Sequence, residues 1–192
     1  MNIQEFTIFD TTIGPCGIAW GGKGILAVQL PEAREAATRA RLARRLPEAR
    51  ESSPPPAIAR VIKDIVALLE GERTELNDAV LDMEGVPAFN REVYAIARAI
   101  PPGETLSYGD VATRLGDATA ARLVGQALGQ NPFPIIVPCH RVLAADGRTG
   151  GFSARGGIAT KLRILSIERA RTSNAPLLFD DLPLAARPSS RR

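Results

Sequence analysis

Residues 107–142 read SYGDVATRLGDATAARLVGQALGQNPFPIIVPCHRV. Ser107 is predicted to cap a helix, with Asp110 in the capping-box position three residues later, and this helix should run to Leu115 before a glycine ends it. A second helix is predicted over 119–129, because its apolar residues recur at helical spacing and prolines follow it. Two short helices joined by a glycine-containing turn form a helix-turn-helix.

The run after the second helix is predicted to be extended and buried. Ile135-Ile136-Val137 lies between prolines and leads into Cys139 and His140. Neighbouring side chains of a strand point to opposite sides, so direct contact between Cys139 and His140 requires a turn or a bridging water.

Elements on either side of this segment predict an α+β fold. Alternating apolar residues, glycine turns and helical periodicity define the remaining strands and helices. The predicted strands cover 3–9, 17–20, 25–30 and 80–81, and the predicted helices cover 32–46, 58–69, 89–100 and 158–170. We therefore expect a small sheet-plus-helix domain over 1–85, a mostly helical domain over 86–171, and a mobile tail over 172–192.

The 192 residues include 24 Lys/Arg and 21 Asp/Glu, and these charges are unevenly distributed. Residues 1–85 contain 10 basic and 13 acidic side chains, whereas residues 86–171 contain 11 and 6. Of the 24 basic residues, 21 are arginine, the side chain best suited to phosphate. This pattern fits a basic module that binds a polyanion, and an ordinary solvated surface is the alternative.

Cysteine and histidine are scarce. Two cysteines and one histidine are too few for a tetrahedral zinc site built from these residue types alone, so we predict no metal. No apolar run approaches the ~18 residues that span a bilayer, and the first ten residues lack the pattern of a signal peptide. With free cysteines expected, the predicted location is the cytoplasm.

The second predicted helix has two unlike faces. The expected core stripe is Ala120, Leu123, Val124, Ala127 and Leu128. The opposite face carries Ala121, Gly125 and Gly129, with Arg122 and Gln126 beside them. Each glycine costs a helix about 1 kcal/mol relative to alanine, which indicates that something approaches this face closely. A neighbouring helix is one candidate. The other is a DNA minor groove, only about 6 Å wide, with Arg122 projecting into the base stack.

The only histidine, His140, adjoins one of the two cysteines. A free thiol has a pKa of about 8.5, so a nucleophilic Cys139 needs a base or a positive field. Glu168, near the apolar side of the last predicted helix, is a candidate carboxylate to orient His140. The alternatives are a buried, unreactive Cys139, a core histidine, and a Glu168 paired with arginine or solvent. These residues alone do not distinguish a thiol hydrolase from a transferase.

The segment 131–142 closely resembles the active-site signature of the O6-alkylguanine-DNA alkyltransferases, also called methylated-DNA–protein-cysteine methyltransferases. The resemblance runs from about Pro87 to Glu168, while the N-terminal half matches only as a small α+β domain. It implies a winged-helix-like helix-turn-helix that binds double-stranded DNA through the minor groove. It also implies that the damaged base is flipped out, because a thiol cannot attack a stacked, paired base in line.

The resemblance assigns catalytic roles to five residues. Cys139 takes the alkyl group from O6 of guanine, or from O4 of thymine, once per molecule and without a cofactor. His140 accepts the thiol proton through a water, and Glu168 orients His140. Tyr108 assists flipping and hydrogen-bonds the extruded base, and Asn131 ties the recognition helix to the cysteine segment.

The resemblance also implies contacts with DNA and with the flipped base. Arg122 fills the vacated stack. The other expected DNA contacts are Tyr108, Ala121, Gly125, Gln126 and Arg141. The base pocket is expected to include Val142, Phe152, Ser153 and Lys161.

Some positions depart from the family pattern. Phe152 stands where members often carry tyrosine, and the loop over 151–157 is longer than in common members. Arg155 in that loop is a candidate phosphate contact. Some relatives bind zinc in the N-terminal domain, but this chain has only Cys16 there and no histidine, so we predict no such site.

The leading hypothesis is a single-turnover DNA repair protein that acts as a monomer. The first alternative is a non-catalytic protein that binds alkyl lesions and recruits other repair machinery, although such proteins replace the cysteine. A helix-turn-helix regulator is disfavoured because the second helix lacks polar side chains to read bases in the major groove. A Cys-His hydrolase is the remaining alternative.

Overall fold

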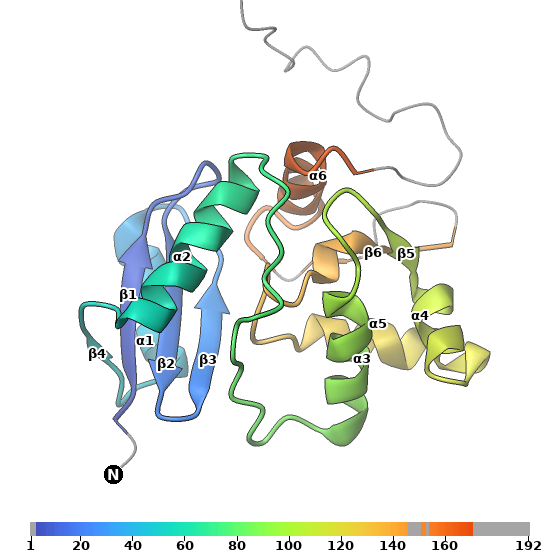
Figure 1. The fold of residues 1–192 in the computed structure, drawn as a ribbon, viewed down its shortest axis with the longest axis horizontal. Coiled ribbons are helices and arrows are strands. Elements are labelled where there is room, and N and C mark those ends of the chain that lie inside the picture. Colours follow the sequence, from blue (N-terminus) through green and yellow to red (C-terminus); the bar gives the residue numbers. More distant parts are fainter. Residues whose placement is uncertain (1–2, 146–150, 153, 171–192) are drawn as a thin grey trace, which may run out of the picture.

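A four-stranded sheet forms the centre of the N-terminal half (Figure 1). The computed structural model describes residues 3–145, 151–152 and 154–170. The sheet has the order β3-β2-β1-β4, with β1 over Glu5–Phe9, β2 over Cys16–Gly21, β3 over Gly24–Gln29 and β4 over Arg50–Glu51. The first three strands are antiparallel and confirm the strands predicted there, whereas β4 pairs parallel to β1 and was not predicted.

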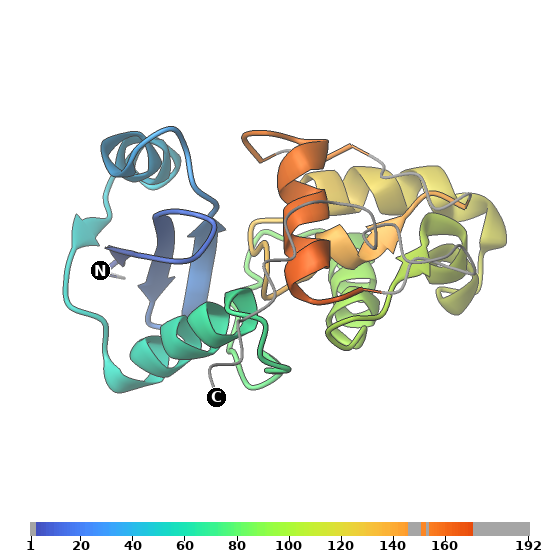
Figure 2. The same cartoon turned by 90° about the horizontal axis from the view of Figure 1, so that it is seen from above.

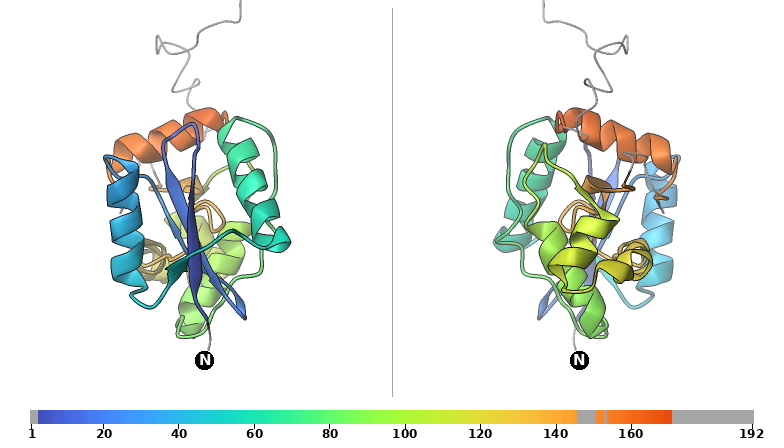
Figure 3. Two further views of the ribbon diagram at one scale, coloured as in Figure 1. Left: turned by 90° about the vertical axis from the view of Figure 1, so that its left-hand side faces the viewer. Right: turned by 90° about the vertical axis from the view of Figure 1, so that its right-hand side faces the viewer.

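Helices cover both faces of this sheet (Figure 3). Helix α1 spans Glu35–Arg45 and α2 spans Pro56–Leu69, which confirms both predicted helices. Successive strand residues point to opposite faces, so one face packs small side chains such as Ala19 and Ala27 against Leu42 of α1. The other face packs larger side chains against α2.

The second half is mostly helical and lies beside the sheet (Figure 2). Its helices are α3 over Ala88–Arg98, α4 over Tyr108–Arg114, α5 over Ala121–Gly129 and α6 over Ile158–Ile167. Two short 3-10 helices cover Ala118–Ala120 and Cys139–Arg141, and a two-stranded parallel sheet joins β5, Leu106–Ser107, to β6, Val142–Leu143. The predicted α+β fold and its helix pair, α4 and α5, are confirmed.

The start of α4 follows the sequence prediction in detail. The Ser107 hydroxyl oxygen accepts a hydrogen bond from the Asp110 backbone N–H at 3.0 Å, and the Asp110 carboxylate accepts one from the Ser107 N–H at 2.8 Å. This reciprocal capping box satisfies two amide groups that a helix start otherwise leaves free. It fixes the position of Tyr108, the first residue of the helix.

Two strand predictions were wrong. Residues 135–137 form no strand, because Ile135 has a φ of 75° and an isolated bridge joins Pro134 to Val137 across a tight turn. Prolines cannot donate to a ladder, and a left-handed φ is a strained conformation for a β-branched residue. The predicted strand at 80–81 is reduced to a single bridge between Leu81 and Ile25.

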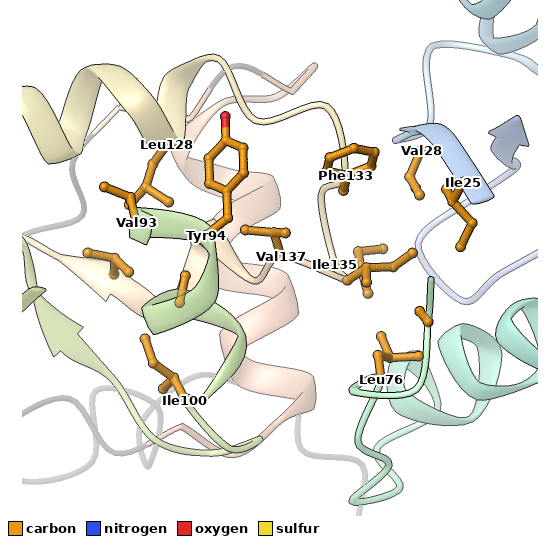
Figure 4. Close-up of a cluster of buried hydrophobic side chains, with 14 of the residues drawn as sticks. Ile25, Val28, Leu76, Val93, Tyr94, Ile100, Leu128, Phe133, Ile135 and Val137 are labelled. Carbon is orange, nitrogen blue, oxygen red and sulfur yellow. The ribbon is translucent and has the colours of Figure 1, made fainter. Parts of the chain in front are cut away.

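One hydrophobic cluster runs through both halves of the molecule (Figure 4). Phe133 and Ile135 lie between Val28 of β3 and the side chains around Tyr94 of α3. The backbone N–H of Val28 also donates to the carbonyl of Pro132 at 2.9 Å. This packing fixes the segment before Cys139 against the sheet, and the domain boundary near residue 85 stays a prediction. In the described part of the chain, no helix is both long and apolar enough to cross a bilayer.

Candidate active site

Cys139 begins a 3-10 turn that directly follows Pro138. Asn131 holds this segment in place, because its side-chain amide donates to the carbonyl of Val137 at 2.8 Å and its oxygen accepts from the N–H of Phe133 at 2.9 Å. Asn131 therefore fixes the segment that leads to Cys139, and its role as a tie to the recognition helix stays a prediction. Burial raises the pKa of the Cys139 thiol, and the Asn131 side chain and the charge of Lys161 oppose that shift.

His140 and Glu168 form a fully buried pair. Nε2 of His140 lies 3.0 Å from Oε1 of Glu168, and both side chains are nearly inaccessible to solvent. Burial alone would raise the pKa of Glu168, but hydrogen bonds and positive charge from His140 and Arg141 lower it to about 2. Glu168 is thus a carboxylate, which places the neutral imidazole proton on Nε2. The predicted pairing of His140 with Glu168 is present.

The second ring nitrogen of His140, Nδ1, is buried and has no hydrogen-bond partner in the described part of the chain. Among the described residues, Nδ1 of His140 is the one buried side-chain nitrogen or oxygen that lacks a hydrogen-bond partner. With the proton on Nε2, Nδ1 carries a free lone pair. Burial lowers the pKa of His140, against the opposing effect of Glu168, so the imidazole stays neutral and able to accept a proton.

Arg141 was predicted to contact DNA, but the structure places its guanidinium inside the fold. Its side chain is 5% exposed. Nε and Nη2 donate to the two Glu168 oxygens at 2.8 and 2.7 Å, and Nη1 donates to the carbonyl of Ile100 at 2.6 Å. A guanidinium with all three edges engaged inside the fold cannot reach a phosphate. Arg141 instead orients Glu168 and keeps it ionised.

Tyr108 and Lys161 lie on the side of Cys139 that faces the helix pair. Lys161 is fully buried, its Nζ donates to the carbonyl of Val142 at 2.7 Å, and it lies 5.9 Å from the centre of the Tyr108 ring. Burial lowers the pKa of Lys161 and raises that of Tyr108. Tyr108, Lys161 and Val142 therefore lie close to one another, but Lys161 and Val142 are fully buried and line neither of the two cavities at Cys139, so their place in a base pocket stays a prediction.

The outer face of α5 is open. Arg122 and Gln126 are exposed, and a Cβ at Gly129 would meet no heavy atom of the described chain within 4 Å. A Cβ at Gly125 would lie 3.8 Å from Tyr108 Cε1. Tyr108 of α4 thus approaches Gly125, whereas nothing in the described residues outside α5 lies within 4 Å of a Cβ at Gly129, which favours the DNA alternative for that end of the face. Leu123 was predicted to be in the core but is 51% exposed, and the buried face of α5 is formed by Val124, Ala127 and Leu128.

Two cavities meet at Cys139. The smaller, of about 20 Å³, is lined by Tyr108, Gly125, Gly129, Gly151 and Phe152. The larger, of about 90 Å³, lies toward the sheet and is bounded by Pro134, Phe152 and Ala154, with Arg41 and Arg45 of α1 opposite. Sequence reasoning placed Phe152 here but missed both arginines, because no local motif links α1 to Cys139. Ser153 lies outside the described residues.

The second cysteine behaves differently. Cys16 is buried within β2, and burial raises the pKa of its thiol to about 12. Such a thiol is inert at neutral pH. Within the described residues, no group of three or more His, Cys, Asp or Glu side chains is arranged to hold a metal ion.

Comparisons with known proteins agree on one family. A family model described as "6-O-methylguanine DNA methyltransferase, DNA binding domain" matches residues 88–170. A methylated-DNA–protein-cysteine methyltransferase of Methanothermobacter thermautotrophicus is 36% identical over 152 residues, covering 79% of this chain and 78% of that protein. The protein of the same name from Mycobacterium tuberculosis is 35% identical over 176 residues, covering 92% and 99%.

Solved structures give the same result. The crystal structure of the Mycobacterium tuberculosis O6-methylguanine methyltransferase matches with a TM-score of 0.70 and 34% identity, over 91% of this chain and 96% of that one. A complex of the Mycobacterium tuberculosis protein with DNA matches with a TM-score of 0.69 and 33% identity, over 86% and 92%.

Proposed function

Because this chain belongs to the methylated-DNA–protein-cysteine methyltransferase family, we propose that it repairs DNA by moving an alkyl group from O6 of guanine to its own Cys139. The unpartnered Nδ1 of His140, buried next to Cys139, is the observation that carries this proposal. A buried lone pair on the residue that directly follows Cys139 is suited to accept the thiol proton through one water. O4 of thymine is a second candidate alkyl donor.

The proton path explains how a buried thiol becomes a nucleophile. Cys139 is protonated at neutral pH because burial raises its pKa. As the sulfur attacks the alkyl carbon, the thiol proton passes through the water to Nδ1 of His140, and Glu168 stabilises the imidazolium that forms. Lys161 adds positive charge near the developing thiolate. The S–C bond forms while the C–O6 bond breaks, and the electron pair leaves with O6.

The released guanine takes up a proton and regains its normal form. Tyr108 lines the small cavity at Cys139, and we propose that its hydroxyl donates a hydrogen bond to that leaving group. The atoms balance with protein, lesion and water alone. The thioether at Cys139 has no route back to the thiol, so each molecule acts once.

The base side of the site must open when DNA binds. A cavity of about 20 Å³ has room for about one ordered water, which requires roughly 10–15 Å³, so it cannot hold guanine. Phe152 and Gly151 form its outer wall. We therefore infer that Gly151 and Phe152 move away from Cys139 as the base enters.

The DNA interface is proposed to be the open face of α5. A helix with glycine at Gly125 and Gly129 is smooth enough for a minor groove, and Arg122 is exposed and free to enter the vacated stack. Affinity for DNA should then fall steeply with salt. We place this activity in the cytoplasm, on a monomeric protein, where thiols remain reduced.

Mass spectrometry tests the proposal. The protein is mixed with a duplex that carries one O6-methylguanine, digested with trypsin, and its cysteine peptides are measured. We expect a gain of one CH2 on the peptide that ends at Arg141, capped at one per molecule. Cys139→Ala should abolish the gain and Cys16→Ala should leave it intact. Tight binding without any gain would contradict the proposal and favour a non-catalytic lesion binder.

A further inference from the structure

The larger cavity at Cys139 has two unlike walls. Pro134 and Phe152 form an apolar wall on the C-terminal half, and Arg41 and Arg45 of α1 form a basic wall on the N-terminal half. We call these two residues the α1 arginines. The cavity of about 90 Å³ is several times what one ordered water requires. A one-carbon alkyl group such as methyl would leave most of this cavity empty.

The basic wall lacks matching negative charge. No carboxylate lines this cavity or the adjoining groove, where Arg44 joins the α1 arginines, among the described residues. One nitrogen of Arg41 pairs with Glu32 at 3.1 Å, which leaves the rest of its guanidinium available. Arg45 takes part in none of the ion pairs in the described chain.

The α1 arginines are also close enough to affect each other. Partial burial lowers the pKa of Arg45, and the positive charge of Arg41 lowers it further. Two like charges on one wall are unfavourable until an anion binds between them. Both side chains remain accessible from solvent, so an anion can reach them.

We propose that this cavity selects O6-alkyl groups that end in an anion, of which carboxymethyl is the smallest. The CH2 of the substituent faces the sulfur of Cys139, and its carboxylate contacts the α1 arginines. A phosphate of the DNA backbone is the competing anion. The cavity favours the substituent, because the same space is lined by Cys139 itself. The inference rests on the transfer to Cys139 proposed above.

The transfer step is the same displacement with a different substituent. The Cys139 sulfur forms a bond to the CH2 carbon, and the bond from that carbon to O6 breaks with its electron pair on O6. The thiol proton leaves through His140, and the released guanine gains one proton. The product is S-carboxymethylcysteine at Cys139, with its carboxylate held by the α1 arginines.

Three duplexes of one sequence test the inference in single-turnover assays at fixed salt. They carry O6-methylguanine, O6-carboxymethylguanine, or the neutral amide O6-carbamoylmethylguanine, which matches carboxymethyl in shape. The natural protein should transfer carboxymethyl faster than carbamoylmethyl. Arg41→Gln and Arg45→Gln each remove a charge-assisted contact with the carboxylate. Each variant should therefore lower the ratio of the carboxymethyl rate to the methyl rate about tenfold.

Controls separate this inference from the proposed function. Arg39→Gln removes the same charge from α1, but Arg39 pairs with Glu35 and Glu51, so the rate ratio should not change. Equal losses on all three lesions in the Arg41 and Arg45 variants would assign these residues to the DNA backbone and overturn the inference. If the natural protein transfers methyl but not carboxymethyl, the inference about the α1 arginines is overturned while the proposed function stands. Failure to transfer even methyl would overturn the proposed function as well.

Discussion

The buried carboxylate of Glu168 offers the sharpest test of how this site is held together. Glu168→Gln keeps the size of the side chain but removes its charge. The change leaves the Arg141 guanidinium buried without a counter-charge and weakens the partner of His140 Nε2. We expect both a less stable protein and slower alkyl transfer.

Two independent arguments give the same magnitude. Breaking a buried ion pair by removing one partner costs about 3–5 kcal/mol. Separately, the pKa of Glu168 falls from 4.5 to about 2 in the fold, and at 1.36 kcal/mol per unit this corresponds to about 3 kcal/mol of stability. Because the folded pKa is lower, this stability is present above pH 4.5 and is lost as the pH falls toward 2.

Urea unfolding of the natural protein and of Glu168→Gln measures this effect. With a slope of about 2 kcal/mol per molar urea, the midpoint should fall by about 1.5 M at pH 7. The difference between the two proteins should shrink by more than half at pH 3, because Glu168 of the unfolded chain, with a pKa near 4.5, is then protonated while the folded protein still holds it ionised. Glu92→Gln, an exposed change of the same kind, is the control. A pH-independent difference, or one below 1 kcal/mol by the same slope, would refute the ion-pair reasoning.

Three further changes probe the proton path and the DNA face. His140→Gln removes the proton acceptor, so transfer at pH 7 should slow about a hundredfold and recover as rising pH ionises Cys139, whose pKa burial already raises; a flat pH–rate profile would contradict this role. Arg122→Ala should leave the free energy of unfolding within about 0.5 kcal/mol, because the side chain is exposed. It should slow repair of duplex DNA more than transfer from free O6-benzylguanine, and equal losses would argue against stack filling. Gly125→Ala fits beside Tyr108 and should stabilise α5 by up to about 1 kcal/mol while weakening DNA binding. A more stable variant that binds DNA as tightly would show that the minor groove does not contact this face.

Local signals made much of this fold predictable. Alternation placed β1 to β3, and the Ser107 capping box placed the start of α4 and therefore Tyr108. These features depend on neighbours within a few residues, which the sequence shows directly. The pairing of His140 with Glu168 was predicted because a carboxylate on an apolar face needs a partner.

Long-range packing accounts for most of what was missed. The α1 arginines reach Cys139 only because the sheet and the segment around Phe133 pack against each other. The two-residue strands β5 and β6 are too short to produce a periodic pattern, and they pair across more than thirty residues of chain. Leu123 fitted the apolar period of α5 and still faces solvent.

The strand predicted before Cys139 also gave the wrong directions for the side chains that follow it. Neighbouring side chains of a strand point to opposite sides, so a strand would not bring His140 and Arg141 to one partner, and the DNA contact of Arg141 was expected from the family resemblance alone. The positive φ of Ile135 turns the chain before Pro138, and the 3-10 turn that follows brings both side chains onto the carboxylate of Glu168. Because that carboxylate binds Arg141 through both oxygens, it stays ionised and fixes the His140 tautomer. The turn that replaces the predicted strand thus leaves Nδ1 of His140 buried without a partner, as the proposed proton transfer from Cys139 requires.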